Sequence, residues 1–210
     1  MISVLEKPVS KRRTASKETR QLQLIRATIR SIAKHGLSTT TMATVSSEAR
    51  LSQGIINLHF QSKERLLVET LRFVVDEYKT AWEKALKGSG DSSAEKLTAL
   101  VGVDFEKSVC QRNKLAVWFA FWGETKSRPV YRKICTERDR EYSEVLIGLC
   151  TDIVRDGAYI GIKAESVAYG LSAMSEGLWL DLLISPATIT PEQAMGICMD
   201  YLKNVFPRHF

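Results

Sequence analysis

Apolar residues recur every three or four positions along most of this 210-residue chain, and they never alternate regularly with polar residues. A spacing of three to four places apolar side chains on one face of a helix, whereas a half-buried strand requires a period of two. Start and stop signals divide the pattern into about nine segments. The sequence therefore predicts an all-α fold of about nine helices.

Capping residues and helix breakers give approximate bounds for these helices. Ser, Thr, Asp and Asn favour helix starts, proline is tolerated in the first turn, and glycine is common just past the end. Ser92 with Glu95, and Thr190 with Gln193, have the spacing of capping boxes. The expected helices are 17–35, a short helix to about Ala49 that Thr40 or Thr41 caps, 53–59 after Ser52, 63–86 after Ser62, 93–109, 113–124, 129–156, 164–184 and 191–205.

Positive charge is concentrated in the first third of the chain. Residues 1–70 contain twelve Lys and Arg against five Asp and Glu, whereas residues 71–210 contain eighteen against nineteen. A basic segment followed by a nearly neutral body is typical of a protein that binds a polyanion. A solvated basic tail is the alternative explanation. Residues 1–16 are polar and lack periodicity, which predicts a basic flexible arm.

Cysteine usage and hydropathy favour a soluble cytoplasmic protein that has no membrane partner. Cys110, Cys135, Cys150 and Cys198 form no CxxC pair and lie in apolar or helical sequence, so we expect reduced thiols that are mostly buried. A redox sensor is the weaker alternative. The beginning of the chain lacks the apolar core of a secretion signal. The longest uninterrupted apolar run, residues 115–122, is far shorter than the ~20 residues that cross a bilayer.

The segment LSQGIINLHFQSKERLL, residues 51–67, predicts a helix-turn-helix unit. Two short helices are joined by a tight turn and preceded by a longer packing helix, and in such a unit the second short helix enters the DNA major groove. Gly54 in its first turn lets the backbone approach DNA closely. Ile56 and Phe60 are expected to pack inward. A small three-helix packing unit without a DNA role is the alternative.

Candidate DNA contacts lie in and around the second short helix. Gln53 and Asn57 are expected to read base edges, an apolar side chain can contact a thymine methyl group, and Lys63 is expected to bind a phosphate. The full set is Thr40, Thr41, Ser52, Gln53, Gly54, Ile55, Asn57, Leu58, His59 and Lys63.

The segment TTMATVSSEARLSQGIINLHFQSKERLL resembles the DNA-binding part of the TetR family of transcriptional regulators. The segments KLAVWFAFWGETKSRPVYRKI and YGLSAMSEGLWLDLLI resemble the body of BetI-type members, which repress choline–glycine betaine genes. The similarity runs from about residue 17 to 206. It departs from the family at Arg50, where glycine is common, and at Asn57 and Leu58, where aromatic residues or histidine are common, so the operator of a relative does not transfer.

This resemblance implies a domain organisation and a mode of action. The expected domains are the arm (1–16), a helix-turn-helix DNA-binding domain (17–62) and a ligand-binding and dimerisation domain (63–210). A homodimer would read a palindromic operator in double-stranded DNA, and a small-molecule inducer, choline or a related amine, would release it. The ligand must bind the two states with different affinity.

A cluster of aromatic residues, Trp118-Phe119-Ala120-Phe121-Trp122, predicts where that ligand binds. Ring faces attract a quaternary ammonium group, and a carboxylate nearby would strengthen the attraction. Ordinary core packing is the alternative for each aromatic residue. The candidate ligand-binding residues are Asp104, Phe105, Trp118, Phe119, Trp122, Tyr142, Glu176 and Trp179.

The last two helices carry small and apolar residues that suit a helix-to-helix dimer interface. Two such helices from each subunit would form a four-helix bundle on a two-fold axis. The candidate interface residues are Gly170, Ala173, Met174, Gly177, Leu178, Ile197, Tyr201 and Val205.

Other functions have less support in the sequence. His35, His59 and His209 lie in no catalytic pattern, and no metal-binding spacing or phosphate loop occurs, so we expect neither enzyme activity nor a cofactor or metal. A ligand-independent architectural DNA-binding protein would not need so large a neutral body. A transcriptional activator of the same family stays open, because the sign of regulation depends on the position of the operator.

Overall fold

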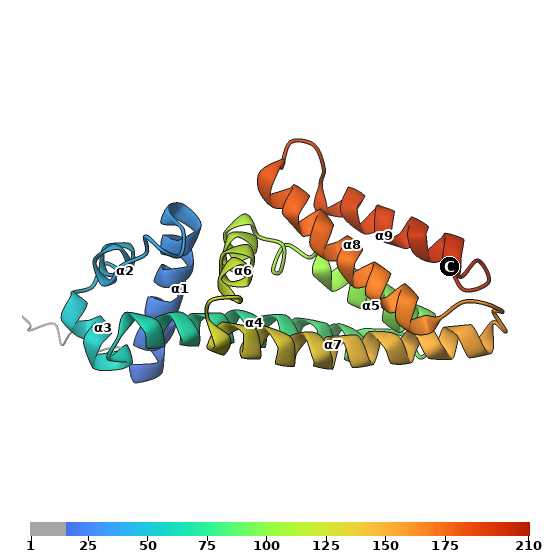
Figure 1. Ribbon diagram of the computed structural model, residues 1–210, viewed down its shortest axis with the longest axis horizontal. Coiled ribbons are helices and arrows are strands. Elements are labelled where there is room, and N and C mark those ends of the chain that lie inside the picture. Colours follow the sequence, from blue (N-terminus) through green and yellow to red (C-terminus); the bar gives the residue numbers. More distant parts are fainter. Residues whose placement is uncertain (1–15) are drawn as a thin grey trace, which may run out of the picture.

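The computed structural model describes residues 16–210, and all regular secondary structure in that range is helical (Figure 1). The all-α prediction is therefore confirmed. The arm predicted for residues 1–16 lies outside the described residues, except for Ser16. The helices are α1 (Lys17–His35), α2 (Met42–Ala49), α3 (Gln53–Phe60), α4 (Lys63–Gly88), α5 (Ser93–Asp104), α6 (Arg112–Glu124), α7 (Pro129–Asp156), α8 (Ala164–Ile184) and α9 (Pro191–Val205).

Local capping explains most of these bounds. Hydroxyl groups of N-cap residues accept backbone N–H groups of the first turn in α1, α2, α4, α5 and α9, which satisfies donors that the helix itself leaves free. The capping boxes predicted at Ser92 and Thr190 are both present. Ser52 precedes α3 as expected, but its side chain makes no capping hydrogen bond.

Helix α5 ends five residues earlier than its pattern predicts, at Asp104 instead of Val109. The indole N–H of Trp179 donates to the main-chain oxygen of Asp104 at 2.8 Å. A continuing helix would use that oxygen for the amide of Ser108. The amide of Phe105 instead bonds back to Gly102 in a tighter turn, so a tertiary contact accompanies the early end of the helix.

The helices form an elongated molecule with a small head at one end (Figure 1). Helices α1, α2 and α3 make the head. The long helices α4 and α7 lie side by side along the molecule, and α5 packs against both. Helices α8 and α9 pack together at the end away from α3, and α6 stands between α1 and α8.

Two clusters of buried apolar residues stabilise this arrangement. The head cluster contains Leu24, Ala27, Val45, Ala49, Ile56, Phe60 and Leu66. The larger cluster fills the body and also takes Ile29 and Ile32 from α1. Because α1 and α4 contribute to both clusters, a movement in the body bears directly on the head. The four cysteines are free thiols, three of them buried and Cys110 half-buried, as the sequence predicted.

Candidate DNA-binding head and ligand site

Helix α3 presents the two faces that its sequence predicts. Ile56 and Phe60 are buried in the head cluster, whereas Asn57 and Leu58 are exposed, Leu58 by 74%. Gln53 and Gly54 are also exposed, at the first turn of the helix. A short helix that exposes both polar and apolar side chains near its N-terminus has the form of a helix that reads the DNA major groove.

The turn between α2 and α3 depends on a left-handed residue. Arg50 has φ 55° and ψ 42°, and the backbone N–H groups of Arg50 and Leu51 bond back to the carbonyl oxygens of Ser47 and Ser46. Glycine is the usual residue in this conformation, because a Cβ atom is strained there. Arg50 therefore adopts the same left-handed conformation as the glycine that is common in the family, and its Cβ atom is strained there.

No contact inside the described part of the molecule requires a glycine at position 54. A Cβ atom at this position would meet only the Oγ atom of Ser52, at an ordinary 3.8 Å, and Gly54 does not adopt a left-handed φ. Glycine in a helix costs stability relative to alanine. The missing side chain instead leaves the first turn of α3 open to a ligand outside the head.

The predicted DNA contacts around α2 and α3 differ in their surroundings. Thr40 is buried, and its hydroxyl donates to the main-chain oxygen of Gly36 at 2.7 Å, so its prediction as a DNA contact is wrong. Ile55 is half-buried and packs against the head cluster, not freely outward. Thr41 is exposed but serves as the N-cap of α2, and His59 is half-buried near the end of α3.

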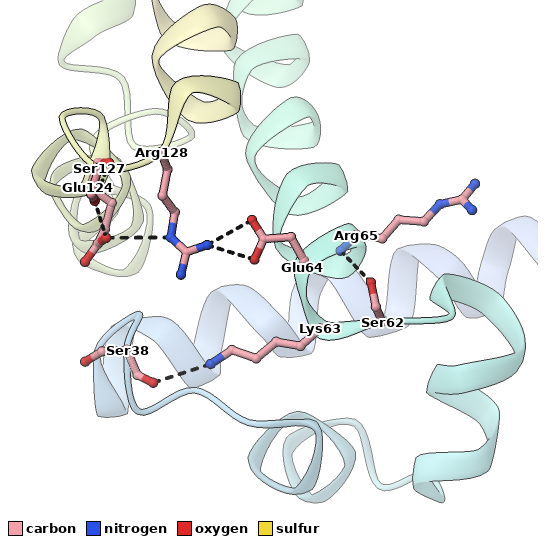
Figure 2. Close-up of polar contacts among 8 residues, drawn as sticks. All are labelled: Ser38, Ser62, Lys63, Glu64, Arg65, Glu124, Ser127 and Arg128. Carbon is pink, nitrogen blue, oxygen red and sulfur yellow. Dashed lines mark hydrogen bonds and ion pairs between the residues drawn. The ribbon is translucent and has the colours of Figure 1, made fainter.

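The start of α4 lies at the junction of head and body (Figure 2). The ammonium group of Lys63 donates to the main-chain oxygen of Ser38 at 3.4 Å, so it faces this junction. Next to it, the guanidinium of Arg128 lies 3.0 and 3.1 Å from the two carboxylate oxygens of Glu64, and 3.7 Å from Glu124. The connection between α6 and α7 is thus tied to the helix that begins at the head.

A buried carboxylate occupies the centre of the body. Asp104 is 3% exposed, and its Oδ1 atom accepts the hydroxyl of Tyr78 at 2.6 Å. The hydroxyl of Tyr142 lies 3.5 Å from Oδ2. Since Trp179 binds the main-chain oxygen of the same residue, α4, α5, α7 and α8 all meet at Asp104.

Burial controls the ionisation of this site. Loss of hydration raises the pKa of Asp104 to about 6, although hydrogen bonds from Tyr78 and Ser175 act in the opposite direction. Burial also raises the pKa of Glu176 and of Asp139. Acidic groups with a raised pKa in a cavity are characteristic of functional sites.

Aromatic rings surround the carboxylate. The ring centroid of Tyr78 is 5.7 Å from that of Tyr142, 5.9 Å from that of Trp179 and 6.3 Å from that of Trp118. Trp122 lies 5.8 Å from Trp118 and stacks on Trp179 at 6.4 Å. The aromatic cluster therefore consists of Tyr78, Trp118, Trp122, Tyr142 and Trp179, drawn from α4, α6, α7 and α8.

A cavity of about 50 Å³ lies beside this cluster. Four of the predicted ligand residues line it, namely Asp104, Tyr142, Glu176 and Trp179. Sequence reasoning missed Tyr78, whose position four residues before Trp82 on an apolar helix face was a usable signal. It also missed Arg138 and Ser175, for which the sequence carries no signal, since Arg138 lies in the charged run ERDREY.

The other predicted ligand residues differ in their surroundings. Trp118 is buried and Trp122 half-buried, both in the aromatic cluster near the cavity. Phe105 is buried in the body core at the end of α5 and lines neither this cavity nor the wider cleft of about 450 Å³ beside α4. Phe119 packs edge-on against Trp122 at 5.2 Å and does not line the cavity. Phe105 and Phe119 therefore lie outside this cavity, and their part in ligand binding stays a prediction.

The chain matches two family models that divide at the head and the body. Residues 24–70 match the bacterial regulatory proteins of the tetR family, and residues 93–207 match the C-terminal part of BetI-type transcriptional repressors. The chain belongs to the BetI-type branch of the TetR family. It is therefore a DNA-binding transcriptional regulator and not an enzyme.

Relatives of this BetI-type regulator are similar over nearly their whole length. It is 31% identical to the HTH-type transcriptional regulator BetI of Burkholderia thailandensis, over 89% of this chain and 93% of the relative. A transcriptional regulator from Pseudomonas aeruginosa PAO1 has a TM-score of 0.80 at 26% identity, over 96% of this chain and 99% of that one. A regulator from Saccharomonospora viridis, solved in complex with choline, has a TM-score of 0.79 at 22% identity, over 90% and 97%.

The BetI-type body has an exposed apolar stripe along α8. Ala173 and Gly177 are exposed as expected, and Tyr169, Leu180 and Ile184 extend the stripe at spacings of three and four residues. Sequence reasoning missed these three larger side chains. On α9, Ile197 is exposed, whereas Tyr201 and Val205 are half-buried, as is Met174 on α8.

Two residues predicted for a dimer interface face the interior of the regulator instead. Leu178 is 8% exposed and belongs to the body core. A Cβ atom at Gly170 would lie 3.1 Å from the hydroxyl oxygen of Tyr201, so this glycine allows α8 and α9 of one chain to approach each other. Leu178 thus packs in the core and Gly170 against α9, both beside the exposed stripe, and their contribution to a dimer stays a prediction.

Helix α8 is also the one described helix that is long and apolar enough to cross a membrane. Its buried side packs against α7 and α9, as in the core helix of a folded domain. Its length and composition thus have an explanation within the regulator.

Proposed function

We propose that this regulator is a repressor that leaves its operator when a small quaternary amine binds in the body. The observation that supports this ligand class is the buried carboxylate of Asp104 within the aromatic cluster. Each ring face attracts a soft cation by ~0.5–2 kcal/mol, and the carboxylate supplies the opposite charge. The choline complex of the S. viridis regulator, which shares the fold, supports the same class.

On DNA, α3 would lie in the major groove with its first turn against the backbone. The exposed Gln53 and Asn57 would hydrogen-bond to base edges, and Leu58 would contact a thymine methyl group. Gly54 would allow the close approach, and the N–H groups next to Ser52 would face a phosphate. Lys63 would contribute a phosphate contact only after releasing Ser38. This role implies a cytoplasmic protein.

Two copies would pair through α8 and α9. The exposed stripe of Tyr169, Ala173, Gly177, Leu180 and Ile184 supports this pairing, because its small residues allow close contact and its large ones supply apolar area. A two-fold axis through such a bundle gives two heads that read a palindromic operator.

Release of DNA requires that the body affects the head. Helix α6 carries Trp118 and Trp122 and ends at Glu124, which contacts Arg128, and Arg128 contacts Glu64. Helix α6 also packs against α1. A ligand that moves α6 would therefore shift α1 and α4, which both contact α3.

Fluorescence anisotropy on DNA from upstream of the regulator's own gene tests this proposal. We expect tight binding compared with random DNA of equal length, a steep loss of affinity with salt, and release by millimolar choline. Gln53→Ala and Asn57→Ala should change the sequence preference, whereas loss of a phosphate contact should weaken binding to all sequences equally. Specific binding that choline and other quaternary amines leave unchanged would contradict the ligand class but not the regulator.

A further inference from the structure

The guanidinium of Arg138, from the middle of α7, lies inside the aromatic cluster. Its central carbon is 4.6 Å from the ring centroid of Tyr78, 4.9 Å from that of Trp118 and 6.0 Å from that of Trp122. These are the distances at which a ring face attracts a cation. Arg138 therefore occupies the position that an amine ligand needs.

The hydrogen bonds of this guanidinium are incomplete. The side chain of Arg138 is 6% exposed, and its Nη1 atom donates to Asp139 at 2.7 Å. Its Nε atom is buried and has no hydrogen-bond partner. A buried N–H without an acceptor is a cost that water would remove. Movement of the side chain toward solvent would give this N–H group an acceptor and offset part of the cost of leaving the rings.

The remaining space is too small for a quaternary amine while Arg138 stays in place. The cavity beside the cluster measures about 50 Å³, whereas a cavity that accepts benzene has about 150 Å³. A quaternary ammonium nitrogen is surrounded by four carbon atoms, so it cannot share the ring faces with a guanidinium. Two cations of the same charge at these ring faces would also repel each other.

We propose that Arg138 is an internal substitute for the ligand, and that a quaternary amine binds by displacing its guanidinium from the aromatic cluster. This inference rests on the proposed function, because it assumes an amine ligand. It goes further in assigning to Arg138 the control of affinity: the measured affinity is the intrinsic affinity of the site multiplied by the fraction of molecules in which Arg138 has left.

The charges around the site permit the exchange, because the carboxylates that now attract Arg138 would attract an amine in the same way. Asp139, the partner of Arg138, is itself half exposed, so the guanidinium can move toward water without losing this ion pair. Asp104 and Glu176 stay behind and line the cavity. When the guanidinium of Arg138 leaves, these carboxylates can neutralise the positive charge of the amine that enters. The rings then exchange one cation for another.

The test compares choline and tetramethylammonium binding, by tryptophan fluorescence and calorimetry, in the wild type, Arg138→Gln, Arg138→Lys and Arg140→Gln. Arg138→Gln removes the competing charge, and we expect affinity at least tenfold tighter. Arg138→Lys retains a cation and should stay within about threefold of the wild type. Arg140→Gln is the matched control, because its side chain is 69% exposed on the same helix, and it should change nothing.

The outcomes separate this inference from the proposed function. If a folded Arg138→Gln protein binds the amine more weakly than the wild type does, the displacement is overturned, since Arg138 would then contribute to binding. Absence of amine binding in every variant would overturn the proposed ligand class and this inference with it. Equal affinity in the wild type and Arg138→Gln would overturn the displacement alone.

A measurement on the wild-type protein does not depend on the stability of any variant. The guanidinium of Arg138 lies over ring faces, so the nuclear magnetic resonance of its Hε proton should be shifted by ring currents in the free protein. Saturation with choline should return it to the position of an exposed arginine. A resonance that keeps its shift at saturation would overturn the proposal.

Discussion

Arg128 and Glu64 form an ion pair in which the Nη1 atom of Arg128 lies 3.1 and 3.0 Å from the two carboxylate oxygens of Glu64 (Figure 2). The two residues are 64 positions apart in sequence, one preceding α7 and the other in the first turn of α4. Glu124 at the end of α6 adds a second carboxylate to the same guanidinium. The pair connects the helices of the ligand site to the start of the helix that follows α3.

Loss of this ion pair should reduce the coupling between ligand and DNA. Both side chains are about half exposed, so Glu64→Gln should change the free energy of unfolding by no more than about 1 kcal/mol. The ratio of operator affinities without and with choline should fall several-fold, because the body then moves the head less. Lys133→Ala, which breaks an exposed pair on α7, is the control. An unchanged ratio in Glu64→Gln would exclude this pair from the coupling.

Gly54→Ala should stabilise the protein and weaken its binding to DNA. The added methyl group meets only Ser52 inside the head, so we expect a gain of about 0.5–1 kcal/mol in unfolding free energy. On DNA the same methyl group should collide with the backbone and lower operator affinity at least tenfold. Denaturant unfolding and anisotropy measure the two effects. Undiminished operator affinity would show that α3 does not approach DNA through its first turn.

Arg50→Gly should stabilise the turn between α2 and α3. Arg50 adopts the left-handed conformation, which costs a residue with a Cβ atom roughly 1–2 kcal/mol, so glycine should raise the unfolding free energy by about 1 kcal/mol. Arg50→Ala removes the same charge but keeps the Cβ atom, and it should give no comparable gain. Equal stability of the two variants in urea unfolding would assign the effect to charge instead of backbone strain.

Choline affinity should rise with pH around the pKa of Asp104. This pKa is raised to about 6 by burial, so the carboxylate gains its charge, and its attraction for a cation, between about pH 5 and pH 7. Asp104→Asn should bind choline more weakly. Its choline affinity should rise less with pH, because only Glu176 and Asp139 then gain charge near the site. Affinity of the wild type that is constant over this range would contradict the role of Asp104.

The same shift gives Asp104 an effect on stability with a defined sign. The folded protein holds this proton more tightly than the unfolded chain, so stability is lost as pH rises from the ordinary aspartate pKa to about 6. Asp104→Asn should remove that part of the pH dependence in thermal unfolding.

Ala173→Glu should prevent dimer formation without unfolding the subunit. Ala173 is exposed at the middle of the α8 stripe, so a charge is harmless in the single chain but would be buried between two copies, at a cost of about 3–5 kcal/mol. Light scattering at micromolar concentration should report a dimer for the wild type and a monomer for this variant. Ile160→Glu places the same charge at a position 99% exposed outside the stripe and should stay dimeric. A dimeric Ala173→Glu protein would place the interface elsewhere.

Local signals were sufficient for most helix bounds and for the two faces of α3. Capping residues such as Thr190 and breakers such as Gly36 act within a few residues, so their effect is legible in the sequence. The inward positions of Ile56 and Phe60 follow from helix periodicity alone. The family resemblance, which rests on the same local motifs, was confirmed over both parts of the chain.

The placement of single side chains followed from contacts between distant segments. Thr40 is buried although it is polar, and its hydroxyl donates to the main-chain oxygen of Gly36 at the end of α1. Leu178 belongs to the core because the side of α8 that carries it packs into the body. No local pattern encodes these orientations, since each depends on which helix faces meet.

The sequence by itself thus determined the helical fold, the helix-turn-helix unit and an aromatic region in the body, because each depends on residues that are neighbours in the chain. Only the tertiary structure decided that α5 ends at Asp104, that Tyr78 binds this carboxylate, and that Arg138 fills the aromatic cluster. Asp104, Tyr78 and Arg138 come from three different helices. Their energies depend on burial and on distances across the core, which arise only when the helices pack.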